Sequence, residues 1–200
     1  MDREIWNSRY AGRELIWTAQ PNRFLVAETQ SMAPGTAIDL ACGEGRNAVW
    51  LAEQGWHVTA VDFAEVGLEK GRRLAESRGV SVQWIAADLA DYRPEPGAFD
   101  LVAIMYLQVP EGQRRPIIRA ASSAVADGGT LLVVGHDRAN IEHGYGGPQD
   151  PAVLYTAQDV VGDLDGSGLE VERGERVERA VETDDGTRVA LDALVRARHP

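Results

Sequence analysis

Cysteine and lysine are almost absent from this sequence, which has one of each, Cys42 and Lys70. One cysteine excludes an intrachain disulfide and a cysteine metal cluster, and we predict no metal site. Long apolar runs are also absent, and the charged, aromatic first residues lack the apolar region of a secretory signal. We therefore expect a soluble, cytoplasmic protein.

Positive charge is scarce as well: 20 Lys and Arg residues face 31 Asp and Glu residues, for a formal net charge of -11. Nucleic acid and anionic membranes repel such a chain, so we expect neither as a partner. The 200 residues and the 44% hydrophobic content suit one globular domain. We expect a single domain over residues 1–200, present as a monomer or a homodimer.

Short apolar runs alternate with helical patterns through the middle of the chain. Strands are expected at 36–40, 56–61, 80–86, 99–106 and 130–135, and helices at 46–54, 64–78 and 113–126. Pro116 suits the last of these helices only in its first turn. This alternation predicts a parallel sheet with right-handed crossovers.

The two ends of the chain break that rhythm. The first thirty residues read as two helices separated by Pro21. Near the other end, Thr156 is the expected N-cap of a short helix, with Asp159 completing a capping box. Two strand-like runs then flank Asp185-Gly186, and Asp-Gly between alternating runs predicts a hairpin over 169–198.

The most informative segment is Ala37–Ala48, with the sequence AIDLACGEGRNA. It predicts a buried strand carrying Asp39 near its end, a glycine turn and the start of a helix. Asp62 ends the second strand. Glycines let the backbone approach a ligand closely, and a strand-end carboxylate binds ribose hydroxyls, so this layout favours a nucleoside-bearing cofactor.

Two kinds of cofactor use such a layout. Gly43-x-Gly45-x-x-Ala48 fits the dinucleotide fingerprint, which keeps an NAD(P)-dependent oxidoreductase as an alternative. However, Asp39 precedes the turn and Glu44 lies inside it. Two carboxylates suit the sulfonium and ammonium groups of S-adenosylmethionine and would repel a pyrophosphate, so they favour the first cofactor.

The run DLACGEGRN from Asp39 to Asn47, followed by AVWLA and by VTAVD ending at Asp62, resembles the class I S-adenosylmethionine-dependent methyltransferases. The GEGRN run with Trp50-Leu51-Ala52 is most similar to the branch of the tellurite-resistance and thiopurine methyltransferases. The resemblance implies methyl transfer from S-adenosylmethionine to a small-molecule acceptor by direct displacement. This branch hints at a soft acceptor atom, and a non-catalytic cofactor-binding domain remains a further alternative.

The resemblance also implies the fold, in which the last strand lies antiparallel beside the fifth. We expect an α/β protein with a single Rossmann-like, doubly wound, seven-stranded sheet, mostly parallel with a C-terminal antiparallel hairpin strand. Residues 1–33 would form a helical cap over the cleft and residues 34–135 the cofactor-binding core. Residues 136–156 would form a substrate-side loop, and residues 157–200 a helix plus the terminal hairpin.

The resemblance and the strand ends together predict the cofactor site. Asp39–Gly45 would line the methionine part, Asp62 would accept the ribose hydroxyls, and Asp88 with the backbone of Leu89 would accept the adenine amino group. The full predicted set is Asp39, Ala41, Gly43, Gly45, Arg46, Asn47, Asp62, Phe63, Asp88, Leu89 and Met105. Cys42 is expected to fill space in the turn rather than to act as a nucleophile.

The acceptor side carries weaker signals. His136 follows the fifth strand and is the candidate general base, with Asp137 beside it and His143 nearby; a solvated loop histidine is the alternative. The glycine- and proline-rich loop 137–155 is expected to roof the pocket together with Tyr10 and Trp17. We therefore name His136 and Tyr10 as the candidate catalytic residues.

Overall fold

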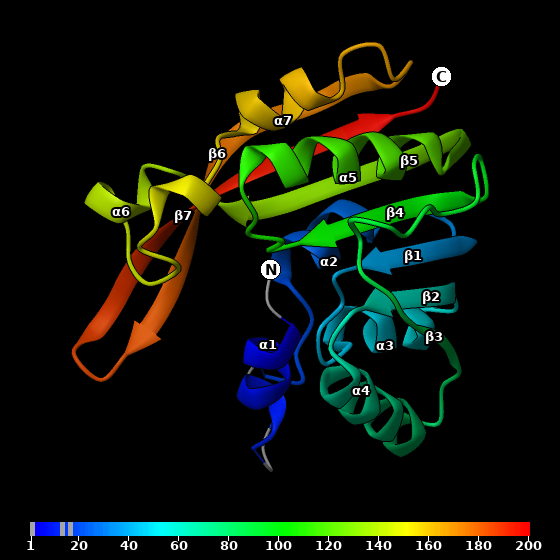
Figure 1. Ribbon diagram of the computed structural model, residues 1–200, viewed down its shortest axis with the longest axis horizontal. Helices are drawn as coiled ribbons and strands as arrows, with labels where there is room; N and C mark the ends of the chain where they lie inside the picture. The colour runs from blue at the N-terminus through cyan, green and yellow to red at the C-terminus, as the bar shows by residue number, and fades with distance from the viewer. Residues whose placement is uncertain (1–2, 13–14, 16–17) are drawn as a thin grey trace.

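A computed structural model describes residues 3–12, 15 and 18–200 (Figure 1). Trp17 lies outside this part of the chain, so its expected place in the pocket wall stays a prediction. No helix within the described residues is long and apolar enough to cross a membrane.

The sheet has seven strands in the order β3-β2-β1-β4-β5-β7-β6 (Figure 1). The strands are β1 (Thr36–Leu40), β2 (His57–Asp62), β3 (Val82–Ala86), β4 (Phe99–Met105), β5 (Val125–His136), β6 (Glu170–Thr183) and β7 (Gly186–Arg198). Strands β1–β5 pair in parallel, and β7 lies antiparallel between β5 and β6. The predicted fold class, including the hairpin strand beside the fifth, is confirmed.

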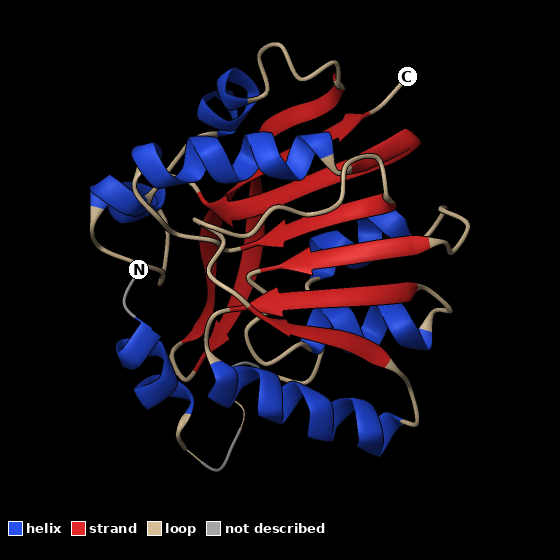
Figure 2. Cartoon of the chain, turned by 45° about the vertical axis from the view of Figure 1, so that its right-hand side comes forward, coloured by secondary structure: helices blue, strands red, loops and turns tan. Residues whose placement is uncertain are grey.

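Helices cover both faces of this sheet (Figure 2). They are α1 (Arg3–Tyr10), α2 (Arg23–Thr29), α3 (Arg46–Glu53), α4 (Glu65–Arg78), α5 (Glu111–Ser123), α6 (Asn140–His143) and α7 (Ala157–Asp163), with a 3-10 turn at Pro151–Val153. Successive strand residues point to opposite faces. Thus Ile38 and Leu131 pack with α5 and α7, whereas Ala37 and Leu132 pack with α2, α3 and α4.

Three local expectations need correction. Helix α5 begins at Glu111, so Pro116 lies in its second turn. Because proline has no backbone N–H, one carbonyl in the first turn of the helix receives no hydrogen bond from it. Strand β5 begins at Val125 and not at the expected Thr130, because Asp127–Gly129 forms a bulge inside it and β4 pairs with β5 on both sides of that segment. The hairpin turn consists of Asp184 and Asp185, one residue earlier than predicted. The Thr156–Asp159 capping box is confirmed.

Strained backbone marks the ends of the two central strands. The strand order reverses between β1 and β4, which is where open α/β sheets bind ligands. Among the described residues, the non-glycine residues with positive φ are Ala41 (62°), just after β1, and Tyr106 (60°), just after β4. Such backbone is costly outside glycine and clusters at functional sites. The search for a site therefore begins at this edge.

Candidate active site

Asp39 is a buried carboxylate without a partner. Its side chain is 0% exposed, and neither carboxylate oxygen has a hydrogen bond within the described residues. Burial, reinforced by the charge of Asp62, raises its pKa to about 7; the Arg46 guanidinium and the Ala48 amide act in the opposite direction. A charge buried without a partner is costly, so a cationic ligand group at this position would be stabilised.

Asp62 holds the glycine turn in place. One carboxylate oxygen accepts a hydrogen bond from the backbone N–H of Gly43 at 2.8 Å, and the other accepts one from the N–H of Ala64 at 2.8 Å. Burial raises the pKa of Asp62, and these backbone bonds oppose the shift. A carboxylate oxygen has two lone pairs, so each retains one for a ligand hydroxyl. Ribose binding by Asp62 stays a prediction.

The glycines of the turn are required by close neighbours. Gly43 has φ 56°, and a Cβ there would lie 2.8 Å from the hydroxyl oxygen of Tyr10. Gly45 has φ 74°, and a Cβ there would lie 2.3 Å from the ring of Trp84. Tyr10 is itself buried, so α1 lies against the turn. The structure thus places Tyr10 on the cofactor side of the site.

Two other side chains of the turn region, Glu44 and Asn47, have partners within the protein. Glu44 forms an ion pair with Lys70 at 2.9 Å, so its charge is compensated by the protein. The expectation that Glu44 serves a cationic ligand is wrong in this geometry, and the charge argument rests on Asp39. Asn47 is buried and accepts a hydrogen bond from the N–H of Asn22 at 2.8 Å.

Arg46 is half-buried at the start of α3 and has no ion pair within the described residues. Burial lowers its pKa, and the nearby Asp39 and Tyr106 act in the opposite direction. Cys42 is buried, and burial raises the pKa of its thiol well above the usual value, as expected of a residue that fills space. Arg46 therefore supplies a positive charge next to the orphaned Asp39.

The residues predicted to hold the adenosine lie along β2–β4. Asp88 is exposed, and its side chain accepts a hydrogen bond from the N–H of Ala90 at 2.9 Å. Leu89 and Met105 are buried, and Phe63 is half-buried. Their contacts with a cofactor stay predictions.

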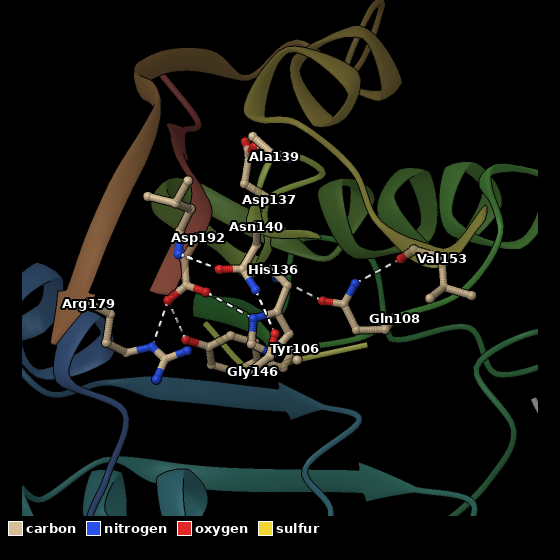
Figure 3. A network of polar contacts seen from close by, with 12 residues as sticks. Tyr106, Gln108, His136, Asp137, Ala139, Asn140, Gly146, Val153, Arg179 and Asp192 are labelled. Atoms are coloured by element: carbon tan, nitrogen blue, oxygen red, sulfur yellow. Dashed lines mark hydrogen bonds and ion pairs between the residues drawn. The ribbon is translucent and has the colours of Figure 1, made fainter. Parts of the chain in front are cut away.

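A second polar cluster lies where β4 and β5 end, opposite the middle of β7 (Figure 3). Asp192 is 0% exposed and accepts hydrogen bonds on Oδ2 from the Tyr106 hydroxyl at 2.8 Å and from Nε of Arg179 at 2.7 Å. Its Oδ1 lies 3.2 Å from Nδ1 of His136. Burial raises the pKa of Asp192, but the nearby His136 and the hydrogen bonds from Arg179 and Tyr106 outweigh it, and the net shift is downward. The structure therefore joins His136 to a buried carboxylate.

Asp137, which is adjacent to His136 in sequence, is not its partner in the structure. Asp137 is buried, but it forms an ion pair with Arg176 at 3.0 Å and accepts a hydrogen bond from the N–H of Ala139. His143 is exposed at the end of α6. The partner is Asp192, which sits opposite His136 in the β5–β7 register. A lone aspartate inside the apolar run Ala190–Val195 was the available sequence signal.

The loop after β5 lies against His136. Asn140 donates a hydrogen bond to the carbonyl of Gly146 at 2.7 Å and accepts one from the N–H of Leu191 at 2.7 Å. A Cβ on Gly147 would lie 3.0 Å from the His136 ring. Asn140 thus ties the loop to β7 and holds Gly147 over the imidazole. Within the described chain, no three metal-ligating side chains gather into a cation site.

The strand order and the antiparallel β7 together define the Rossmann-like methyltransferase fold. The solved N-methyltransferase NodS from Bradyrhizobium japonicum, in complex with S-adenosylhomocysteine, has a TM-score of 0.74 at 19% identity and covers 100% of both chains. TehB from Haemophilus influenzae has a TM-score of 0.73 at 16% identity, covering 99% of this chain and 67% of that one. At these identities the likeness shows the fold alone.

Sequence comparison finds similarity to methyltransferases. Residues 37–129 match the family model described as a methyltransferase domain. The 2-heptyl-1-hydroxyquinolin-4(1H)-one methyltransferase of Mycobacteroides abscessus is 28% identical over 140 residues, which cover 66% of this chain and 60% of the relative. The chain thus spans about 60% of that relative's length. The family match and the relative thus show that this chain is similar to methyltransferases.

Proposed function

We propose that this protein transfers a methyl group from S-adenosylmethionine to a small-molecule acceptor. The observation that carries the proposal is Asp39, whose buried carboxylate has no hydrogen bond among the described residues at the edge where the strand order reverses. A ligand with a cationic end supplies the missing partner.

The chain's residues fit this cofactor. Asp39 would hold its ammonium group, Arg46 its carboxylate, and Asp62 its ribose hydroxyls through the lone pairs that its backbone bonds leave. Bound there, S-adenosylmethionine supplies an activated methyl group. The protein's share is to fix the positions of the reacting groups and to exclude water.

An NAD(P)-dependent oxidoreductase fits the same turn less well. A pyrophosphate over the turn would lie near Asp39, whose charge is already disfavoured by burial and by Asp62. Glu44 no longer contributes to this argument, because Lys70 pairs with it. A non-catalytic cofactor-binding domain would leave the buried Asp192–His136 pair without a use.

The acceptor class has two sources of support that point in different directions. The GEGRN run favours the tellurite-resistance and thiopurine branch, whose resemblance hints at a soft acceptor atom. The name of the Mycobacteroides abscessus relative describes an acceptor that carries a hydroxyl group.

Calorimetric titration with S-adenosylhomocysteine tests the proposal, with NADH and NADPH as competing ligands. We expect micromolar binding of the thioether and no binding of either nicotinamide cofactor. Asp62→Ala should weaken binding by about 1.5–3 kcal/mol, the scale of a charged hydrogen bond. Asp91→Ala, at an exposed loop position, is the matched control.

Because Asp62 also holds Gly43, the isosteric Asp39→Asn is a second variant, and far-UV circular dichroism checks that both variants fold. Binding of a nicotinamide cofactor in preference to S-adenosylhomocysteine would overturn the proposal and make the turn a dinucleotide site.

A further inference from the structure

Four buried side-chain polar atoms lack a hydrogen bond within the described residues. Two are the carboxylate oxygens of Asp39, and the other two are Nδ1 of His136 and Oδ1 of Asp192. Nδ1 of His136 and Oδ1 of Asp192 lie 3.2 Å apart, which is within hydrogen-bonding distance (Figure 3).

The other contacts of Asp192 leave Oδ1 for the histidine. Tyr106 and Arg179 both donate to Oδ2. Tyr106 reaches it from a left-handed backbone (φ 60°), a costly conformation at a non-glycine residue. These two donors orient the carboxylate so that Oδ1 faces β5, where His136 is the cross-strand partner of Asp192.

The imidazole is also held by packing. The ring centroids of Tyr106 and His136 are 4.8 Å apart, and Gly147 lies against the His136 ring. The histidine side chain is only 15% exposed. The charged groups around it are Asp192 on β7 and Arg179 on β6, with Arg46 of α3 near Tyr106. The ring thus has a defined orientation in a partly desolvated site.

The chemistry of the pair sets the tautomer. An ionised carboxylate only accepts hydrogen bonds, so the proton of a neutral His136 belongs on Nδ1, facing Asp192. Nε2 then carries the lone pair, and no described residue forms a hydrogen bond or ion pair with it. A histidine that presents a free Nε2, oriented through Nδ1 by a buried carboxylate, has the arrangement of a general base.

We propose that Asp192 positions His136 as the general base for a weakly acidic hydroxyl, such as a phenol or an enol, on the acceptor. This inference rests on the proposed methyl transfer and adds the acceptor class. The hydroxyl proton moves to Nε2, and the oxygen keeps the O–H bonding pair, which becomes its bond to the methyl carbon. The C–S pair stays with the departing thioether, and the imidazolium, stabilised by Asp192, releases its proton to solvent. A thiolate acceptor would need no such base.

Two probes of the same shape separate these cases: 2-naphthol, which is largely un-ionised near neutral pH, and 2-naphthalenethiol, which is largely ionised. With His136→Gln we expect naphthol methylation to fall about 100-fold, the usual worth of a general base, and thiol methylation to change less than about threefold. Glu178→Gln, at an exposed position of β6, is the matched control and should change neither. Equal losses with both probes would overturn the inference.

The positioning role of Asp192 has its own readout. In protein labelled with ¹⁵N-histidine, NMR should show His136 as the Nδ1–H tautomer, assigned by the signal lost in His136→Gln. In Asp192→Asn we expect the Nε2–H tautomer. We also expect the naphthol pH–rate profile to lose the fall in rate toward low pH that reports a general base. If that variant does not fold, Tyr106→Phe, which removes one of the bonds orienting Asp192, should lower kcat several-fold with little change in KM.

The outcomes are distinguishable from failure of the proposed function. If S-adenosylhomocysteine does not bind the wild-type protein, the methyltransferase proposal fails. If it binds but neither probe is methylated, the tautomer decides: Nδ1–H sustains the inference, and Nε2–H in the wild type contradicts it.

Discussion

Asp39 and Asp192 are both fully buried at the same edge of one sheet, yet their surroundings are opposite. Asp39 has no hydrogen bond within the described residues, and burial raises its pKa to about 7. Asp192 accepts bonds from Tyr106 and Arg179, and the pKa of its carboxyl lies below the usual value. The first carboxylate is incomplete without a ligand, whereas the second is completed by the protein.

The difference separates two regions of this sheet edge by what surrounds each carboxylate. The orphaned carboxylate lies beside the glycine turn, where binding of a cationic group is stabilising. The paired carboxylate lies beside His136, and we propose that its fixed negative charge orients this histidine as a base. The four predictions below, in decreasing order of expected effect, are ways to break or sharpen this contrast.

Removing each carboxylate should have unequal effects on stability. Asp192→Ala leaves Arg179 and the Tyr106 hydroxyl without their partner, and breaking a buried ion pair in this way costs about 3–5 kcal/mol. Asp39→Ala removes a buried charge that has no partner, which offsets the cost of the cavity, so any loss of stability should stay under about 2 kcal/mol. Urea denaturation at pH 7.5 measures both. Comparable losses would show that Asp39 has a structural partner.

The pH dependence of stability should single out Asp39. The native state holds a proton on this carboxyl up to about pH 7, whereas the unfolded chain releases it near 3.8. Its stabilising contribution is therefore complete below 3.8 and is lost as the pH rises to about 7, by up to about 4 kcal/mol at 1.36 kcal/mol per pKa unit.

Asp39→Asn lacks this titration. Relative to the wild type it should gain stability between pH 4 and pH 7 and show a constant difference above pH 8. Asp192 titrates in both proteins, so its acid-range contribution cancels in the comparison. A difference independent of pH would mean that Asp39 ionises normally in the folded protein.

The packing of the loop on His136 can be separated from backbone strain. Gly147 (φ 76°) and Gly146 (φ 70°) have similar backbones, so alanine at either should cost about 1–2 kcal/mol. Only at Gly147 would the Cβ meet the imidazole, since nothing lies within 4 Å at Gly146. We expect Gly147→Ala to lower naphthol methylation about tenfold more than Gly146→Ala, with S-adenosylhomocysteine affinity unchanged in both.

The smallest expected effect concerns Glu44. Because Lys70 compensates its charge, Glu44→Gln should change S-adenosylhomocysteine affinity by less than about threefold. Asp39→Asn, measured by the same calorimetry at pH 8, should weaken binding at least about tenfold. The reverse ranking would restore Glu44 as the residue that meets the cationic ligand.

The relative placement of the residues predicted to bind the cofactor could be read from the sequence, because these residues are close together in it. Asp39, Gly43 and Gly45 follow one strand, and Asp62 ends the strand that pairs beside it, so parallel topology alone brings them together. The same local reading failed for Glu44, because its partner Lys70 lies on the next helix.

The contact between His136 and Asp192 depends on a strand register that no local sequence pattern reveals. His136 meets Asp192 only because β7 inserts antiparallel beside β5 with those two residues opposite each other. Arg179 joins them from β6, whose pairing with β7 continues beyond the last β5 pair. The sequence located the histidine at the sheet edge, but the adjacent Asp137 was a closer candidate in the chain than the residue that partners it in space.

Proton release on cofactor binding tests the central claim most directly. S-adenosylhomocysteine is titrated at pH 6.5 in two buffers of different ionisation enthalpy, into the wild type and into Asp39→Asn. If the ammonium group pairs with Asp39, binding should expel most of one proton from the wild type and almost none from the variant. Binding without proton release, or with equal release from both proteins, would contradict the assignment of Asp39 as the cofactor's anionic partner.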